Sequence, residues 1–263
     1  MMKSFADIIA AVKAKGPKLM AVAGEPNVEL AEAIARAEAE GIATAKIFDD
    51  APSAALAVRN GECDLLIKGT VDTPGFMKAV LDKENGLRGG DLISHFLLIE
   101  AFGRLIGMTD SGINIAPTLE QKAAIIRNAL PILNVLGIDC PKVAVLAAVE
   151  KVNPKMPATV EADALAKMGI EGCEIQGPLA MDLAISPNAV AIKGLSGPVA
   201  GQADLVVMPD LAAGNIAAKT IMYFSECKTG GVVAGTSRPV AFTSRSDTAD
   251  IRFHTLVLGV MMS

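Results

Sequence analysis

Short aliphatic runs alternate with stretches of helical periodicity along almost the whole chain. The aliphatic runs predict strands at residues 18–24, 45–50, 64–69, 96–101, 104–110, 142–150, 204–209, 231–235 and 239–244. The periodic stretches predict helices at 1–16, 28–41, 73–86, 117–137, 158–169, 212–226 and 247–260. Strands that alternate with helices indicate an α/β fold with a largely parallel sheet.

Glycine and proline refine this pattern at three places. Phe102-Gly103 separates two neighbouring strands and predicts a hairpin. Pro131 predicts a kink or a break inside the helix at 117–137. The run 170–202 is rich in glycine and proline, and we expect it to consist mainly of loops.

Two segments of the chain have the same residue pattern. Cys63-Asp64-Leu65-Leu66-Ile67 and Ala203-Asp204-Leu205-Val206-Val207 each precede a polar loop that contains glycine, and then a helix. A true structural repeat would imply two similar α/β lobes with a cleft between them. Ligands of open α/β folds bind at the carboxyl ends of strands. The alternative is that Asp-Leu-aliphatic is simply a common way to enter a strand.

Composition narrows the class of protein. Hydrophobic residues make up 51% of the 263 residues and charged residues 20%, which is enough for a large core. The net charge of −5 and the absence of tryptophan argue against a nucleic-acid binder, which needs a basic field or stacking aromatics. An anionic substrate must therefore be bound by local cations.

Cysteine, histidine and hydropathy point to the cellular setting. The four cysteines form no CxxC pair, and with only two histidines a structural zinc site is not expected. The N-terminus lacks the features of a signal peptide, and no apolar run reaches the length of a membrane span. We expect a cytoplasmic protein that contacts neither membrane nor nucleic acid.

The strongest candidate chemistry lies in TSRSDTAD, near the C-terminal end. Ser244 and Arg245 fall where an expected strand ends, and Asp250 lies in the first turns of the next helix. Such a junction presents backbone N–H groups and a positive dipole end to an anion. Arginine adds two parallel charge-assisted hydrogen bonds to phosphate. These residues suit a reaction on a phosphate, although Ser246, Asp247 and Asp250 could also serve as helix caps.

Other polar loops at strand ends could line the same binding site. An ordinary turn, a helix cap or a solvated lysine is the alternative at each of them. The candidates are Lys68 and Gly69 in KGTVDT, Asn114 in DSGINIAP, Asn153, Pro154 and Lys155 in VEKVNPKMP, and Asp210, Gly214, Asn215 and Lys219 in PDLAAGNIAAK. The glycine fingerprints of nicotinamide and nucleotide P-loop sites are both missing.

Several stretches together resemble the phosphate acetyl/butyryltransferase family, especially its butyryltransferase branch. They are LLIKGTVDTPGFMKAVLDKENGLR, DSGINIAPTLEQK, KVAVLAAVEKVNPKMPAT, ADLVVMPDLAAGNIAAKT and PVAFTSRSDTAD. The resemblance covers the chain from about Leu65 to its end, and the N-terminal 60 residues resemble the family by pattern more than by motif.

The resemblance implies a fold, an activity and a domain organisation. The fold is that of isocitrate and isopropylmalate dehydrogenases, with two αβα lobes and an active site in the interlobe cleft. We expect lobe I at 1–118 plus 239–263 and lobe II at 119–238. The reaction is acyl-CoA + phosphate ⇌ acyl phosphate + CoA, through a ternary complex. Coenzyme A is a substrate, no cofactor is tightly bound, no metal is used, and the enzyme works as a homodimer or larger homo-oligomer.

The resemblance also implies the catalytic residues. The family's serine, arginine and aspartate fall on Ser244, Arg245 and Asp250 when one residue is deleted after Arg245, and Asp247 is the competing carboxylate. The acetyltransferase branch has a further arginine near the helix after the KGT-like loop, where this chain has Met77 and Lys78.

The chemistry places different demands on the two directions. Phosphate is already ionised at pH 7, so its attack on a thioester needs positioning and charge neutralisation. In the reverse direction the CoA thiol, with a pKa of about 8.5, must lose a proton, and an aspartate with a pKa of about 3.9 is a poor base. We therefore expect burial in the cleft to raise the pKa of Asp250.

Two other classes remain as alternatives. One is a metal-dependent 2-hydroxyacid dehydrogenase of the same fold, which would need a carboxylate cluster and a nicotinamide site. The other is a non-catalytic subunit that binds CoA or acyl phosphate.

Overall fold

The computed structural model describes all residues from Met1 to Ser263 and divides into two compact units. The terminal unit contains residues 2–93 and 228–263, and the central unit contains residues 94–227 together with Met1. The chain passes between the units at 93/94 and 227/228, whereas the predicted exchanges were at 118/119 and 238/239. The difference arises because the hairpin at 94–109 belongs to the central unit, and the strand at 228–234 belongs to the terminal unit.

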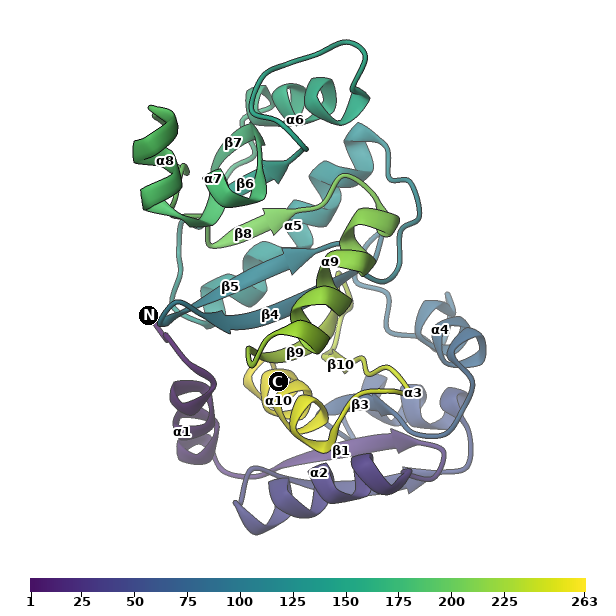
Figure 1. Cartoon of the computed structure of the whole chain (residues 1–263). Coiled ribbons are helices and arrows are strands. Elements are labelled where there is room, and N and C mark those ends of the chain that lie inside the picture. The colour runs from purple at the N-terminus through teal and green to yellow at the C-terminus, as the bar shows by residue number, and fades with distance from the viewer. The chain divides into compact units, whose positions relative to one another are not determined.

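The terminal unit is built on five strands in the order β2-β1-β3-β10-β9 (Figure 1). Neighbouring strands are parallel except for β9 and β10, which are antiparallel. The elements are α1 (Phe5–Lys15), β1 (Lys18–Ala23), α2 (Val28–Ala39), β2 (Ala43–Phe48), α3 (Ala51–Arg59), β3 (Leu65–Lys68), α4 (Thr73–Leu81), β9 (Lys228–Ala234), β10 (Val240–Ala241) and α10 (Ala249–Met261).

Two elements form the middle of this unit. Every residue of β3 is buried, as expected for a central parallel strand covered on both faces. Helix α10 is buried from Arg252 to Met261 and packs against β9, α2 and α1. The ring of Phe5 in α1 stacks on His254 of α10, with the ring centroids 4.4 Å apart. An apolar helix of this kind belongs inside a domain.

The central unit contains five strands in the order β4-β5-β8-β6-β7. Here β4 and β5 form an antiparallel hairpin, and the other neighbours are parallel. The elements are β4 (Ser94–Ala101), β5 (Arg104–Thr109), α5 (Leu119–Val135), β6 (Lys142–Leu146), α6 (Pro157–Lys167), β7 (Glu174–Leu179), α7 (Met181–Ile185), α8 (Pro187–Lys193), β8 (Leu205–Val207) and α9 (Leu211–Phe224).

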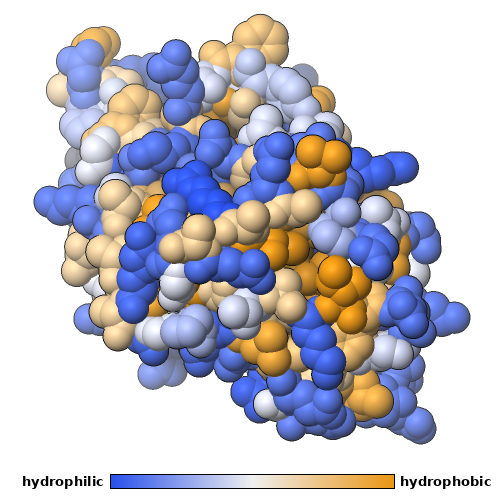
Figure 2. Space-filling view, turned by 90° about the horizontal axis from the view of Figure 1, so that it is seen from below, coloured by the Kyte–Doolittle hydropathy of each residue, from blue (hydrophilic) through white to orange (hydrophobic).

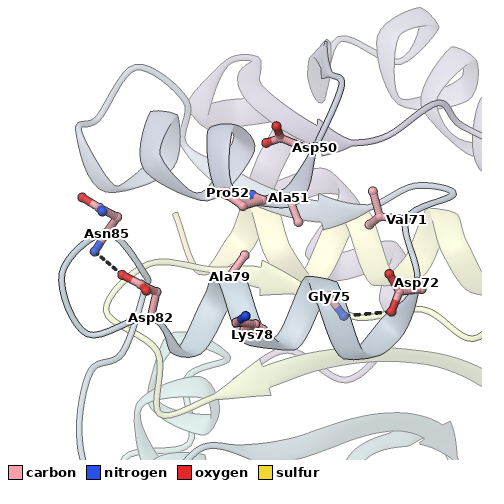
Figure 3. A pocket seen from close by; sticks show the side chains of 10 residues that line it. All are labelled: Asp50, Ala51, Pro52, Val71, Asp72, Gly75, Lys78, Ala79, Asp82 and Asn85. Atoms are coloured by element: carbon pink, nitrogen blue, oxygen red, sulfur yellow. Dashed lines mark hydrogen bonds between the residues drawn. The ribbon is translucent and has the colours of Figure 1, made fainter.

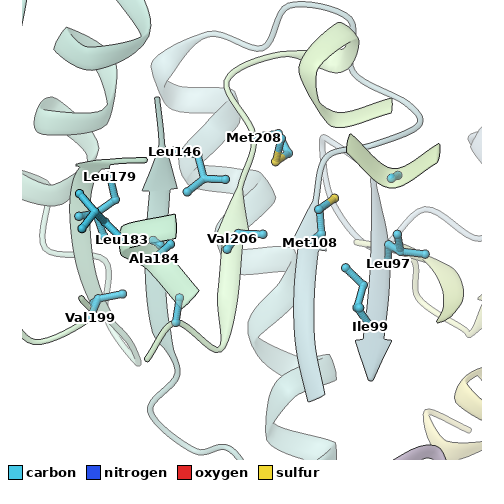
Figure 4. Packing of buried hydrophobic residues seen from close by; sticks show 13 residues of the cluster. Leu97, Ile99, Met108, Leu146, Leu179, Leu183, Ala184, Val199, Val206 and Met208 are labelled. Carbon is cyan, nitrogen blue, oxygen red and sulfur yellow. The ribbon is translucent and has the colours of Figure 1, made fainter. Parts of the chain in front are cut away.

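The hydrophobic core on one face of the central sheet is shown in Figure 4. Leu97, Met108, Val206 and Leu146 come from four strands, and Leu183 comes from α7; each is at most 4% exposed. Burial of this aliphatic surface provides the main driving force for packing the helices on the sheet.

The similarity between residues 63–67 and 203–207 has a structural counterpart. β3 and β8 are the third strands of their sheets, and β2-β1-β3-β10-β9 and β7-β6-β8-β5-β4 have the same sequence of parallel and antiparallel neighbours. Asp64 accepts a hydrogen bond from Leu19 N at 2.8 Å, and Asp204 accepts one from Lys142 N at 2.9 Å. Each aspartate N–H also donates to the carbonyl of that same neighbour at 2.8 Å. The two units therefore repeat the same strand entry.

Two regions differ from the sequence prediction. Helix α3, which Asp50 caps by accepting a hydrogen bond from Ser53 N, falls where no element was expected. The run 170–202, expected to be mainly loops, contains β7, α7 and α8. Prolines explain why α3 and α8 were missed: Pro52 lies in the first turn of α3 and Pro187 begins α8, and the first turn is the part of a helix that tolerates proline.

Two further helices differ from their predicted course: one ends early, and the other continues through a proline. Helix α4 stops at Leu81 because Asp82 has an extended backbone and its carboxylate accepts hydrogen bonds from Glu84 N and Asn85 N. Helix α5 runs through Pro131 without a break and ends at Val135. The buried residues on both sides of the proline hold its last turn in place.

The exterior is chemically mixed. On the face shown in Figure 2, hydrophilic side chains alternate with apolar ones. No helix is both long and apolar enough to cross a membrane.

Candidate active site

The loops that follow β1 and β3 in the terminal unit lie against each other. Gly69 N donates to Ala23 O at 2.9 Å. A Cβ atom on Gly69 would lie 2.4 Å from the carbonyl oxygen of Gly24, so a glycine is required for this close approach. The approach brings Lys68 and Asn27, the N-cap residue of α2, to the same pocket.

The turn from Ser244 to Asp247 forms the opposite wall of that pocket. The Asp247 carboxylate accepts a hydrogen bond from Ser244 N at 2.6 Å, and Ser244 O accepts one from Asp247 N at 3.2 Å. The guanidinium of Arg252 donates to the carbonyl oxygens of Asp247, Ser244 and Arg245 at 3.0, 3.1 and 3.3 Å. The turn is therefore held from both sides.

These segments enclose a cavity of about 210 Å³, which we call the cationic pocket. Three of its lining residues are cations and none is a carboxylate. The lining residues are Asn27, Lys68, Gly69, Thr70, Thr243, Ser244, Arg245 and Arg252.

The pKa of Lys68 reflects the burial and the positive charge of this pocket. The Lys68 side chain is 5% exposed, and its ammonium donates to the carbonyl oxygen of Gly69 at 3.1 Å. Burial lowers the pKa of Lys68, and the neighbouring charges of Arg252 and Arg245 lower it further, while Asp72 opposes them. A bound anion would relieve both the desolvation and the repulsion.

A second cavity of about 420 Å³ lies between α3 and α4 (Figure 3). It shares the loop 68–72 with the cationic pocket, because Val71 and Asp72 line it. Its lining combines apolar residues with aspartates, of which Asp72 and Asp82 accept hydrogen bonds from Gly75 N at 2.9 Å and Asn85 N at 2.7 Å. The lining residues are Asp50, Ala51, Pro52, Val71, Asp72, Gly75, Lys78, Ala79, Asp82 and Asn85.

The other candidate residues lie in the central unit, where Asn114 belongs to a tight turn around Asp110. The Asp110 carboxylate, which is buried, accepts hydrogen bonds from the backbone N–H groups of Gly112, Ile113 and Asn114 at 2.8 to 3.0 Å. It also accepts one from the side-chain amide of Asn114 at 2.6 Å. Asp110 therefore fixes both the backbone and the side chain of Asn114.

The start of α9 packs on that turn. Asp210 is the N-cap and accepts a hydrogen bond from Ala213 N at 2.8 Å. A Cβ atom on Gly214 would lie 2.2 Å from Asp110 O, and Asn215 Nδ2 donates to Ser111 O at 3.2 Å. The structure thus brings together Asn114, Asp210, Gly214 and Asn215, as their positions at strand ends suggested.

His95 supports the same turn. Its Nδ1 lies 2.7 Å from Ser111 Oγ. Desolvation lowers the pKa of His95 to about 4, because it outweighs the charge of Asp110, and the charge of Lys219 acts in the same direction as desolvation. The imidazole is therefore neutral at physiological pH, and Lys219 lies close enough to contribute to that state.

The loop after β6 holds the three remaining candidates. Asn153 accepts a hydrogen bond on Oδ1 from Lys155 N at 3.0 Å, and its own N–H donates to Thr159 Oγ1 at 2.8 Å. The side chains of Pro154 and Lys155 are exposed to solvent. The loop is ordered by its own hydrogen bonds, in which both the side chain and the backbone of Asn153 take part.

Asp250 is placed differently from what the sequence suggested. Its carboxylate is 79% exposed and forms an ion pair with Arg36 of α2 at 3.1 Å. It does not line the cationic pocket. The expected burial of Asp250 is therefore not found, because the first turn of α10 directs this side chain towards α2, whereas Asp247 is 6% exposed and bonded to Ser244.

Four lining residues were not among the sequence candidates: Asn27, Thr70, Thr243 and Arg252. Asn27 and Thr70 follow strands β1 and β3, so the rule that ligands bind at strand ends could have identified them. Arg252 had a different signal, because it precedes a long apolar run within its helix. A buried arginine needs polar partners, so an arginine at such a position indicates a role in holding nearby backbone or in binding a ligand.

The fold and the site together define a class of protein. An α/β unit that presents buried cations and a helix N-terminus at its strand ends is an architecture that binds phosphate-bearing ligands. The family model "Phosphate acetyl/butaryl transferase" matches residues 7–260, and the chain belongs to this family of acyltransferases.

Individual relatives agree with this membership. The chain is 37% identical to the phosphate butyryltransferase of Clostridium acetobutylicum over 298 aligned positions, which cover 100% of the chain and 99% of the relative. It is similar to the crystal structure of a branched-chain phosphotransacylase from Enterococcus faecalis V583, with a TM-score of 0.86 and 31% identity over 93% of this chain and 98% of that one.

A more distant likeness concerns the fold alone. A putative 4-hydroxythreonine-4-phosphate dehydrogenase from Salmonella typhimurium matches with a TM-score of 0.52 and 12% identity, over 94% of this chain and 99% of that one. The predicted dehydrogenase-like α/β fold is confirmed.

Proposed function

We propose that this protein catalyses the reversible reaction acyl-CoA + phosphate ⇌ acyl phosphate + CoA on short-chain acyl groups. The observation that carries the proposal is the cationic pocket, where Ser244 and Arg245 face Lys68 at the ends of two strands. Membership of the phosphate acetyl/butyryltransferase family supports the same reaction and does not favour the dehydrogenase alternative.

The cationic pocket would hold inorganic phosphate. Its volume of about 210 Å³ accommodates a small anion, and Arg245 and Lys68 would neutralise the dianion while Ser244 holds one oxygen. The positive end of α2, capped by Asn27, adds to this field. A phosphate oxygen would then attack the thioester carbonyl carbon, and the CoA thiolate would leave without a covalent acyl-enzyme.

In the reverse direction a carboxylate would accept the thiol proton. The motif assigned this role to Asp250, with Asp247 as the competitor. We assign it to Asp247, because its carboxylate accepts a hydrogen bond from the N–H of Ser244, which lines the cationic pocket, whereas Asp250 is exposed and paired with Arg36. A carboxylate held next to Ser244 is placed to accept the thiol proton.

The remaining candidates would bind acyl-CoA. They lie in the central unit and are Asn114, Asn153, Pro154, Lys155, Asp210, Gly214, Asn215 and Lys219. The cavity between α3 and α4 shares a loop with the cationic pocket and offers apolar lining residues for another part of the substrate.

A coupled assay of CoA release tests the proposal. Acetyl-, propionyl- and butyryl-CoA are each offered with phosphate, and the ranking of kcat/KM gives the acyl length. Arg245→Ala should raise the KM for phosphate by about tenfold or more, since a charge-assisted hydrogen bond is lost. Arg238→Ala, an exposed arginine outside the pocket, is the control. No phosphate-dependent CoA release from any of the three thioesters would rule out the enzyme.

Setting and assembly follow from the same proposal. Four free cysteines fit a reducing cytoplasm, where CoA is available. Ile216, Tyr223 and Phe224 are 62% to 88% exposed and recur along α9 at the spacing of one helix face. An apolar face of this kind supports a homodimer or a larger homo-oligomer.

A further inference from the structure

The cationic pocket contains two buried cations that lack an acidic partner. Lys68 is 5% exposed and Arg252 is 3% exposed, and neither forms an ion pair. The contrast within this chain is Lys122, equally buried, which is paired with Glu161. Buried charges are normally paired, so two unpaired cations that line one cavity indicate an anionic ligand.

Arg252 also determines the shape of the turn that carries Ser244. Its Nε donates to Asp247 O at 3.0 Å, and one terminal nitrogen donates to Ser244 O at 3.1 Å and to Arg245 O at 3.3 Å. The Asp247 carboxylate closes the turn from the other side through Ser244 N. The carbonyl and the N–H of Ser244 are therefore both fixed.

A planar guanidinium is suited to this double contact. It presents five donors in a rigid fork, whereas the ammonium of lysine is a point charge on a flexible stem. Three donor contacts to main-chain carbonyls leave the positive charge of Arg252 uncompensated, and the side chain still lines the pocket. The residue can therefore hold the protein with one edge and attract an anion with its charge.

We propose that Arg252 positions the Ser244–Asp247 turn and supplies the third cation that binds the phosphate group in the cationic pocket. This inference rests on the proposed function, because it takes phosphate as the ligand. It adds Arg252 to Ser244, Arg245 and Asp250, the residues that the family motif indicates in this chain. It also explains why an arginine is buried at the start of an apolar run.

The charge of Arg252 has a measurable effect on its neighbour. Arg252, Arg245 and Asp72 are the charged groups that face Lys68, and the two arginines lower its pKa. Removal of Arg252 should raise the pKa of Lys68, so labelling of Lys68 by an amine reagent should require a higher pH. Replacement by lysine should leave this pH dependence close to that of the wild type, since the charge remains.

The test compares Arg252→Met, Arg252→Lys and the control Arg238→Met. Binding of inorganic phosphate alone is measured by calorimetry, and the KM values for phosphate and acyl-CoA are measured separately. In Arg252→Met we expect phosphate binding to weaken about tenfold or more, with the KM for acyl-CoA within about twofold of wild type. In Arg252→Lys we expect phosphate binding to weaken at least about threefold, because the fork is lost.

The outcomes separate this inference from the proposed function. Unchanged phosphate binding in both folded variants would overturn the role of Arg252. If Arg252→Met does not fold, Arg252→Lys with wild-type phosphate affinity would overturn it as well. A wild-type protein that binds phosphate and loses this binding in the variants, yet releases no CoA from any thioester, would support Arg252 and contradict the proposed function.

Discussion

At the scale of single residues, the site depends on which of its charged side chains are buried and which face solvent. Lys68 and Arg252 are buried and form no ion pair with a carboxylate. Asp247 is also buried, and its carboxylate accepts a hydrogen bond from a backbone N–H. Asp250, three residues further on, faces solvent. Spacing in the sequence could not separate the two aspartates, because both lie near the start of the same helix.

The two aspartates should therefore differ in their effect on catalysis. Asp247→Asn should lower thiol-direction turnover by at least about tenfold, since the proposed base is lost. Asp250→Asn should change it by less than about threefold, because an exposed ion pair contributes little. Turnover from acyl phosphate and CoA measures both, and a large loss in Asp250→Asn with a mild one in Asp247→Asn would reverse the assignment.

At the scale of elements, the loops after β1 and β3 matter more than the strands themselves. Their contact depends on Gly69, whose neighbours Ala23 and Gly24 leave no room for a side chain. Similarly, Gly214 lets α9 reach the turn around Asp110. Both glycines had been selected as ligand-binding candidates, and the structure gives them a packing role as well.

Gly69→Ala should destabilise the terminal unit by about 1–3 kcal/mol, because its Cβ would collide with a carbonyl oxygen that cannot move freely. Gly90→Ala is the matched control, since a Cβ there meets nothing within 4 Å. Urea unfolding of the two variants gives the comparison. Equal midpoints would show that the loops can separate without cost.

The sequence predicted most elements because the aliphatic strands and periodic helices carry strong local signals. Helix α3 was missed because its alanines give a weak pattern and its proline resembles a break. Helix α8 was missed for the same reason, and α7 was missed because its five residues are too few to show a helical period. The cationic pocket was predicted in part: Ser244, Arg245, Lys68 and Gly69 lie at the ends of strands, whereas Arg252 reaches the pocket only through the packing of α10.

At the scale of the whole molecule, the two units repeat one strand arrangement. Asp64 and Asp204 immediately precede the equivalent strands β3 and β8, and each makes the same pair of hydrogen bonds, one through its carboxylate and one through its N–H, to the backbone of the neighbouring strand. The similarity of five residues in the sequence was a weak signal by itself. It gains weight because strand order and hydrogen bonding agree with it.

Asp64→Ala and Asp204→Ala should each cost about 1–2 kcal/mol, since a charge-assisted hydrogen bond to the backbone is lost. Hydrogen exchange should locate the damage, with β1 and β3 less protected in the first variant and β6 and β8 in the second. Asp139→Ala, an exposed aspartate, should change neither. Loss of protection in the same strands in both variants would contradict the independence of the two strand entries.

The position of β10 has a consequence for how the protein is made. This two-residue strand lies between β3, near residue 65, and β9, so a segment synthesised much later completes a sheet begun early. Until residues 228–263 leave the ribosome, one edge of β3 has no neighbour, and Lys68 has neither Ser244 nor Arg252 beside it. The central unit lies between these segments and is finished first. The nascent chain must therefore keep an aliphatic strand edge protected until residues 228–263 have been synthesised.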